Sequence, residues 1–213
     1  MTRNPISIRD TVSRYTGRVP DDPPVQGGRP RSERARVAVL HAVDDLLVDV
    51  GYAAITMKGI AERAGVGRQT VYRWWSTKAE ILFEASVLDA TSALASEPQG
   101  STFDDLTAYL EAVSRFLADS PEGAAYRALL GEAQHDPAVA DLLASTDLLG
   151  DSARPVIDRA IQRGDIPAEA APGPTISLLV GPLFFHIIAG GHGRSVTPRD
   201  LAIAFLQSFA GAS

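Results

Sequence analysis

Residues 51–82 constrain this chain most, because they place two short helical patterns on either side of a single glycine turn. Thr56 can cap a first helix over about 57–64, and Gly65 supplies the positive φ that a tight turn requires. A second helix is predicted over about 68–74. Two helices joined by such a turn form a helix-turn-helix, whose second helix can enter the major groove of DNA.

Apolar residues keep a helical spacing through the rest of the chain, without an alternating strand pattern. The expected fold is therefore all-α, with a three-helix N-terminal helix-turn-helix domain and a larger C-terminal helical bundle domain. Residues 1–31, rich in proline and glycine, are expected to form a flexible N-terminal arm. A first helix is predicted from Ser32 to Val50. The expected boundaries of the two domains are 32–77 and 78–213.

Capping residues predict where later helices begin. Thr77 and Glu80 have the spacing of a capping box and open a helix that extends to about Ser96. Thr102 and Asp105 repeat that spacing and predict another helix start. Three further helices are predicted over about 155–162, 175–190 and 197–209.

The charge of the chain is unevenly distributed, although its formal net value is −6. Residues 1–84 contain 13 Lys and Arg against 10 Asp and Glu, whereas residues 85–213 contain 7 against 16. A local excess of cations attracts phosphates even when the whole protein is acidic. The helix-turn-helix therefore lies in the half of the chain that is suited to nucleic acid.

The second helix of this motif begins with side chains that can read base edges. The major groove is about 12 Å wide and accepts one α-helix. Arg68 suits the paired acceptors of guanine, Gln69 suits adenine, and the methyl group of Thr70 can meet a thymine methyl. One turn later, Tyr72 and Arg73 are placed to reach phosphates.

The same segment also contains residues that anchor it. Val71 and Trp75, four residues apart, are expected to face inward and hold the reading helix. Lys78 stands at a helix N-terminus, where a cation and free N–H groups can receive a phosphate. Trp74 has two open interpretations, packing or phosphate contact.

The longer pattern resembles the TetR family of bacterial transcriptional regulators. It consists of Gly-Tyr-x-x-x-Thr, Ile-Ala-x-x-Ala-Gly-Val, Thr-x-Tyr and Lys-x-x-x-Leu, within residues 32–82. The resemblance implies an all-helical homodimer, usually a repressor, whose C-terminal domain binds a small-molecule inducer and dimerises. The family's usual Ser or Thr before the reading helix is Gly67 here, which is a weaker cap. By position, the resemblance implies these DNA-contacting residues: Thr56, Lys58, Arg68, Gln69, Thr70, Tyr72, Arg73 and Lys78.

The arm offers a second group of candidate DNA contacts. The sequence Gly-Arg-Pro-Arg at positions 28–31 resembles the core of a minor-groove AT-hook, and arginines favour narrow A·T minor grooves. Arg29 and Arg31 are therefore candidates for DNA contact. The alternative, a solubilising tail without DNA contact, stays open.

Residues 78–213 contain weaker functional signals. A dimer seam is predicted through the helices at about 155–163 and 175–190, because the second is apolar nearly all round. His135, His186 and His192 are interpreted as structural, and no metal or cofactor is predicted. Five residues are candidates to line a ligand pocket, although the pattern favours plain core for each of them taken singly: Tyr109, Phe116, Tyr126, Leu130 and Gln134.

The leading hypothesis is a homodimeric repressor that a small molecule releases from a pseudo-palindromic DNA operator. One alternative is a regulator of the same fold without a small inducer, controlled by a protein partner or constitutive. Another is a helical enzyme or small-molecule carrier, but the sequence presents no nucleophile–base pair or phosphate loop at recognisable spacing.

The most apolar stretch, 176–189, is too short to span a bilayer, so a cytoplasmic protein without a membrane partner is expected.

Overall fold

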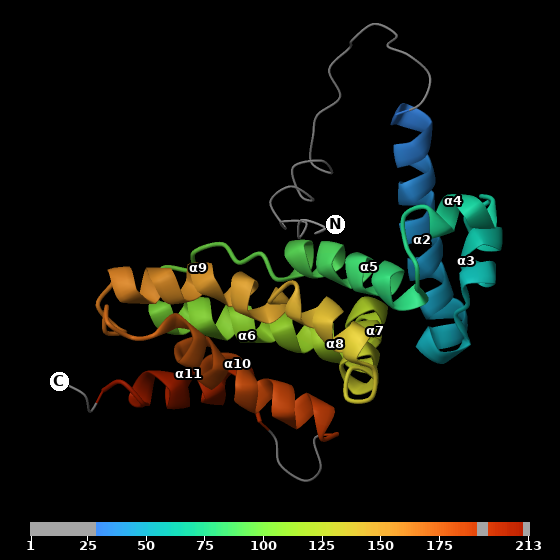
Figure 1. Cartoon of the computed structure of the whole chain (residues 1–213). Coiled ribbons are helices and arrows are strands. Elements are labelled where there is room, and N and C mark those ends of the chain that lie inside the picture. Colours follow the sequence, from blue (N-terminus) through green and yellow to red (C-terminus); the bar gives the residue numbers. More distant parts are fainter. Residues whose placement is uncertain (1–28, 191–195, 211–213) are drawn as a thin grey trace, which may run out of the picture. The chain divides into compact units, whose positions relative to one another are not determined.

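A computed structural model describes residues 29–190 and 196–210 (Figure 1). Residues 1–28 of the predicted 1–31 arm and the histidine at position 192 lie outside these residues. Every regular element in the described ranges is an α-helix, which confirms the all-α expectation. The helices fall into two compact units, one formed by residues up to 89 with 124–146, the other by 90–123 with residues from 147 onward.

The first unit contains the helix-turn-helix. Its helices are α2 (Arg29–Ala54), α3 (Met57–Arg63), α4 (Arg68–Tyr72), most of α5 (Lys78–Ala93), most of α7 (Pro121–Glu132) and α8 (Pro137–Ala144). Both α3 and α4 pack on α2. The core of this unit is largely aliphatic, with Val43, Ile60, Ile81 and Leu82 fully buried. Burial of these side chains, rather than the helical propensity of such short helices, stabilises the unit.

Helix α2 differs from its prediction at both ends. It begins at Arg29, three residues before the predicted start at Ser32, and Pro30 suits a first helical turn. Gly51 interrupts it with a φ of +71°, at the position where the apolar pattern ended. Val50 was expected on the inward face but is 51% exposed, because it occupies the last turn before this break.

The second unit is built around α6 (Thr102–Asp119). Helices α9 (Leu148–Gln162), α10 (Pro172–Ile188) and α11 (Pro198–Gln207) all pack against α6. The buried side of α6 is a continuous stripe at three- and four-residue spacing, which includes Leu106, Leu110, Val113 and Leu117. This stripe forms the core of the unit.

The predicted cap of α6 was wrong by one residue. Ser101, rather than Thr102, caps the helix, because its hydroxyl oxygen accepts the N–H of Asp104 at 3.1 Å. Thr102 and Asp105 are buried instead. Asp105 accepts hydrogen bonds from Arg159 Nε at 2.8 Å and from Arg163 Nη1 at 2.9 Å. A residue interpreted as a cap is therefore the centre of a buried ion-pair cluster.

Helix α9 begins earlier than predicted. Asp147 caps it by accepting the N–H of Gly150 at 3.0 Å, so Pro155 lies inside the helix and not at its start. Pro155 has no N–H to donate to the carbonyl of Asp151, and both residues lie at exposed positions of the helix. The predicted 175–190 helix corresponds to α10, and α5 ends at Ala93 rather than near Ser96. No helix in the described ranges is long and apolar enough to cross a membrane.

Candidate nucleic-acid interface

The turn between α3 and α4 has the predicted construction. The Thr56 hydroxyl accepts the N–H of Gly59 at 3.0 Å and caps α3. Gly65 has a φ of +65°, which a residue with a Cβ adopts only at a cost. Gly67 precedes α4 and gives no side-chain cap, as expected of glycine. The local sequence therefore fixes the angle at which α4 leaves the turn.

Helix α4 is anchored through one face only. Val71 and Trp75 are 1% and 4% exposed, which confirms the predicted inward stripe. Arg68 and Gln69 are exposed in the first turn of the helix, and Thr70 is half-buried. The side chains proposed to read bases thus share the free surface of a helix whose opposite face is held in the core.

The proposed phosphate contacts surround this surface. Tyr72 is 55% exposed and Arg73 is exposed, both at the end of α4. Thr56 and Lys58 are exposed at the start of α3. The Nζ atom of Lys58 lies 3.6 Å from a carboxylate oxygen of Glu62, so part of its charge is balanced within the helix.

The structure separates the two tryptophans that the sequence left ambiguous. Trp75 is buried, whereas Trp74 is 39% exposed. The guanidinium groups of Arg36 and Arg73 each lie 5.7 Å from the centroid of the Trp74 ring. At this distance a cation is attracted to the face of an indole. Trp74 therefore forms cation–π contacts at the surface, beside the candidate phosphate contact Arg73.

Glu84 on α5 is a structural anchor that sequence reasoning missed. One of its carboxylate oxygens accepts the Trp75 Nε1–H at 2.9 Å, and the other accepts a hydrogen bond from Arg36. Arg36 is 7% exposed on α2. The signal in the sequence was an arginine on the inward side of α2, which requires a buried acceptor.

Lys78 is the first residue of α5, as predicted. The Thr77 hydroxyl accepts the N–H of Glu80 at 3.2 Å, which is half of the predicted capping box. The Glu80 carboxylate reaches the N–H of Ser76, at 2.7 Å, instead of that of Thr77. The Lys78 Nζ atom lies 4.6 Å from the centroid of the Tyr52 ring.

The two arginines predicted in the flexible arm lie in the first turn of α2. Arg29 and Arg31 therefore have helical backbone instead of belonging to a flexible segment. A helical turn spaces them differently from an extended minor-groove arm. Their contact with DNA stays a prediction.

The five candidate ligand residues do not lie in one unit. Tyr109 and Phe116 are buried in the second unit. In the first unit, Tyr126 is buried, Leu130 is half-buried and Gln134 is exposed. Tyr109 donates to the carbonyl of Leu149 at 3.0 Å, and burial raises the pKa of its hydroxyl to about 12.

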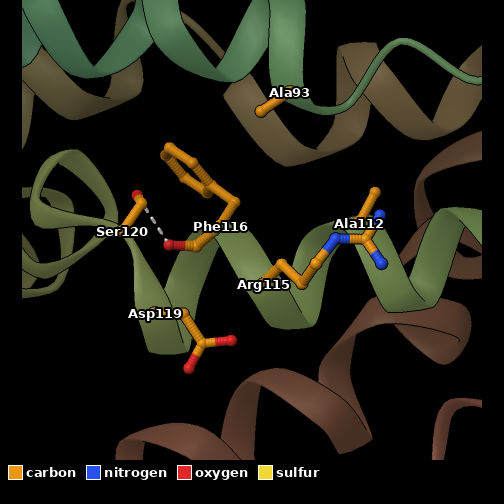
Figure 2. A pocket seen from close by; sticks show the side chains of 6 residues that line it. All are labelled: Ala93, Ala112, Arg115, Phe116, Asp119 and Ser120. Carbon is orange, nitrogen blue, oxygen red and sulfur yellow. Dashed lines mark hydrogen bonds between the residues drawn. The ribbon is translucent and has the colours of Figure 1, made fainter.

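A hollow of about 320 Å³ opens in the second unit (Figure 2). Phe116 is the ligand candidate that lines it, beside the exposed charges of Arg115 and Asp119 on the same helix. The Ser120 hydroxyl donates to the Phe116 carbonyl at 2.9 Å. Ala93 and Ala112 complete the lining. Within the described ranges, His, Asp and Glu side chains form no group that could hold a metal ion.

Comparisons with known proteins identify the kind of protein to which this chain is similar. The family described as "Bacterial regulatory proteins, tetR family" matches residues 39–85, and "Tetracyclin repressor-like, C-terminal domain" matches residues 97–203. The chain is similar to YdeS of Bacillus subtilis, an HTH-type transcriptional regulator, with 32% identity over 179 residues that cover 83% of this chain and 90% of YdeS. It is also similar to the HTH-type regulator Rv1556 of Mycobacterium tuberculosis, with 29% identity over 67% of this chain and 71% of that protein. The crystal structure of the TetR family regulator SCO0332 shares the fold, with a TM-score of 0.69 and 24% identity over 82% of this chain and 97% of that one.

Proposed function

The chain belongs to the TetR family of bacterial transcriptional regulators, and on that premise we propose that it is a homodimeric repressor that a small molecule releases from its operator. It is a DNA-binding regulator and not an enzyme. We assign DNA binding to the domain over 32–77, and ligand binding and dimerisation to residues 78–213.

The observation that carries the proposal is that the first turn of α4 is exposed while Val71 and Trp75 are buried and hold the helix in place. In this reading, Arg68, Gln69 and Thr70 contact base edges. Phosphates are contacted from the ends of the neighbouring helices, by Thr56, Lys58, Tyr72, Arg73 and Lys78. Contacts of the second kind hold the protein in register on the duplex and carry no sequence information.

Dimerisation is supported by the free side of α10. Its buried side includes Ile176, Leu179 and Leu183, whereas Phe185 is 73% exposed and Leu178 is 46% exposed. A helix that is apolar on both sides requires a second apolar surface. We propose that α10, with α9 beside it, pairs with its copy about a twofold axis, which presents two reading helices to a pseudo-palindromic operator.

The ligand site is proposed in the second unit, at the hollow beside Phe116. Its aromatic wall and its two charges, on Arg115 and Asp119, suit a small amphipathic molecule.

A second candidate, a regulator without a small inducer, is favoured by Tyr109, whose hydroxyl is already bonded to Leu149 inside the protein. Thermal-shift screening combined with DNA release separates the two candidates, because only the first requires a small molecule that does both.

The experiment that tests DNA reading begins with selection of bound sequences from random duplexes. The paired change Arg68→Ala and Tyr72→Ala is then expected to abolish binding to the selected site while the dimer persists. The control is Arg199→Ala, because Arg199 is an exposed arginine on α11, outside the proposed DNA interface and outside the proposed dimer helices. Retained binding by the paired variant would overturn the assignment.

A further inference from the structure

Tyr52 connects the end of α7 to the start of α5. It follows the break at Gly51, and its hydroxyl donates a hydrogen bond to a carboxylate oxygen of Glu132, the last residue of α7. The Nζ atom of Lys78 lies over the other part of the same side chain, 4.6 Å from the ring centroid. All three residues belong to the first compact unit and are half-buried.

The ring of Tyr52 restricts a side chain that is otherwise free to move. Within the described residues, the Lys78 ammonium has no carboxylate at ion-pair distance. Lysine has four rotatable side-chain bonds, and ordering them on a phosphate costs conformational entropy. A cation–π contact lowers that cost, because the ammonium is already held near one position.

The ring can only hold Lys78 if the ring itself is fixed. The bond to Glu132 fixes it at the hydroxyl end. The phenol is a protonated donor at neutral pH even at its ordinary pKa, and partial burial and the Glu132 carboxylate raise the pKa of the Tyr52 hydroxyl further. The carboxylate thus has a lasting partner, and Tyr52 has a defined orientation.

We propose that Glu132 is a positioning residue for DNA binding, which acts through Tyr52 to hold the Lys78 ammonium where a DNA phosphate is received. This inference rests on the proposed phosphate contact of Lys78. Glu132 lies within residues 97–203, matched by the C-terminal family, whereas Tyr52 and Lys78 lie within residues 39–85, matched by the DNA-binding family. A displacement of the end of α7 would therefore reach the proposed phosphate contact in two steps. It would act through the hydrogen bond between Glu132 and Tyr52 and then through the contact between the Tyr52 ring and the Lys78 ammonium.

The direction in which Glu132→Ala changes DNA affinity distinguishes a positioning role of Glu132 from an effect of its charge alone. Removal of a carboxylate near DNA reduces electrostatic repulsion, so charge alone predicts tighter binding for Glu132→Ala. Positioning predicts weaker binding, because the ring and the ammonium above it are released. Glu132→Gln removes the same charge but keeps an oxygen that accepts a hydrogen bond from the Tyr52 hydroxyl. We expect this variant to bind DNA at least as tightly as the unmodified protein.

The test uses the full chain and a mixed-sequence duplex of about 30 base pairs, because phosphate contacts do not depend on sequence. We expect Lys78→Ala to weaken binding about tenfold and to lower the slope of log K against log salt by about 1 per bound subunit. Glu132→Ala is expected to weaken binding about threefold to fivefold, and to have no further effect in a Lys78→Ala background. The control is Glu111→Ala, which removes an exposed carboxylate from α6 in the other unit.

Two failures are distinguishable. If Lys78→Ala leaves affinity and salt slope unchanged, the phosphate contact is wrong and the inference fails with it. If Lys78→Ala weakens binding but Glu132→Ala behaves like Glu111→Ala, the phosphate contact stands and the positioning role is overturned. Should Glu132→Ala melt at a lower temperature, Tyr52→Phe takes its place, because it removes the same hydrogen bond and keeps the ring. Unchanged affinity of a folded Tyr52→Phe variant also overturns the inference.

Discussion

The indole Nε1–H of Trp75 donates to Glu84 across 2.9 Å, and this bond joins the segment that follows α4 to α5. The second oxygen of the same carboxylate binds Arg36 on α2. Helix α4 has only five residues, too few for its own hydrogen bonds to hold it. Its orientation therefore depends on Val71, Trp75 and the carboxylate that fixes the indole.

Replacing Glu84 with alanine should destabilise the protein and weaken DNA binding together. Among the residues that the structure describes, the change leaves the buried Arg36 with Glu33, at 3.4 Å, as its one carboxylate partner. We expect a loss of about 2–3 kcal/mol in the free energy of unfolding, near the lower end for a broken buried pair. Urea denaturation measures it. Glu111→Ala, at an exposed position, should change stability by less than about 0.5 kcal/mol, and equal losses in the two variants would contradict the anchor.

Arginines 68 and 73 should differ in what they contribute to binding. Arg68→Ala is expected to cost about 1–3 kcal/mol on the selected operator and to relax preference at one base position. Arg73→Ala is expected to weaken binding to the operator and binding to a mixed-sequence duplex by the same factor. Titrations of both duplexes at two salt concentrations give the comparison. A uniform loss for Arg68→Ala would place that side chain on a phosphate instead.

Phe185→Glu should convert the proposed homodimer to a monomer. Phe185 is 73% exposed on the free side of α10, and a carboxylate facing its own copy in a buried interface has no partner there. Sedimentation or light scattering measures the mass. The matched control is Val48→Glu, since Val48 is 70% exposed on α2 in the other unit. A dimer that survives Phe185→Glu would exclude this side of α10 from the interface.

The elements that the sequence predicted well depend on neighbours along the chain. Caps such as Thr56, turns such as Gly65 and the stripe of Val71 and Trp75 are set by residues at most a few positions apart, and each appears as expected. Two predicted helix starts failed: the adjacent Ser101 caps α6 in place of Thr102, and Asp147 starts α9 two turns before Pro155.

The polar anchors could not be predicted because their partners are distant in sequence. Arg36 and Glu84 are 48 residues apart, Tyr52 and Glu132 are 80 apart, and Asp105 and Arg159 are 54 apart. Spacing along one helix cannot indicate which charge on another helix a buried carboxylate meets. Such pairs require the packing of the helices to be known first.

Asp105 provides a pH-dependent test of one such anchor. Burial by itself would raise the pKa of its carboxyl, but hydrogen bonds from the Gln99 backbone N–H and from Arg159 and Arg163 outweigh burial and lower the pKa. The unfolded carboxyl titrates near pH 3.9, above the pKa of the folded state, so the stabilisation is complete above that pH and is lost as pH falls toward the folded pKa.

Asp105→Asn should therefore reduce the free energy of unfolding by about 3 kcal/mol at pH 7, because two arginines lose their shared carboxylate. The difference between the variant and the unmodified protein should stay constant down to about pH 4 and shrink as pH falls further, because the unfolded carboxyl then takes up its proton before the folded one does. Urea denaturation at several pH values measures both effects. Asp119→Asn, at an exposed position on the same helix, is the control. A difference that stays constant at the lower pH values as well would mean that the cost comes from the amide's altered hydrogen bonding, and that the charge of Asp105 does not stabilise the fold.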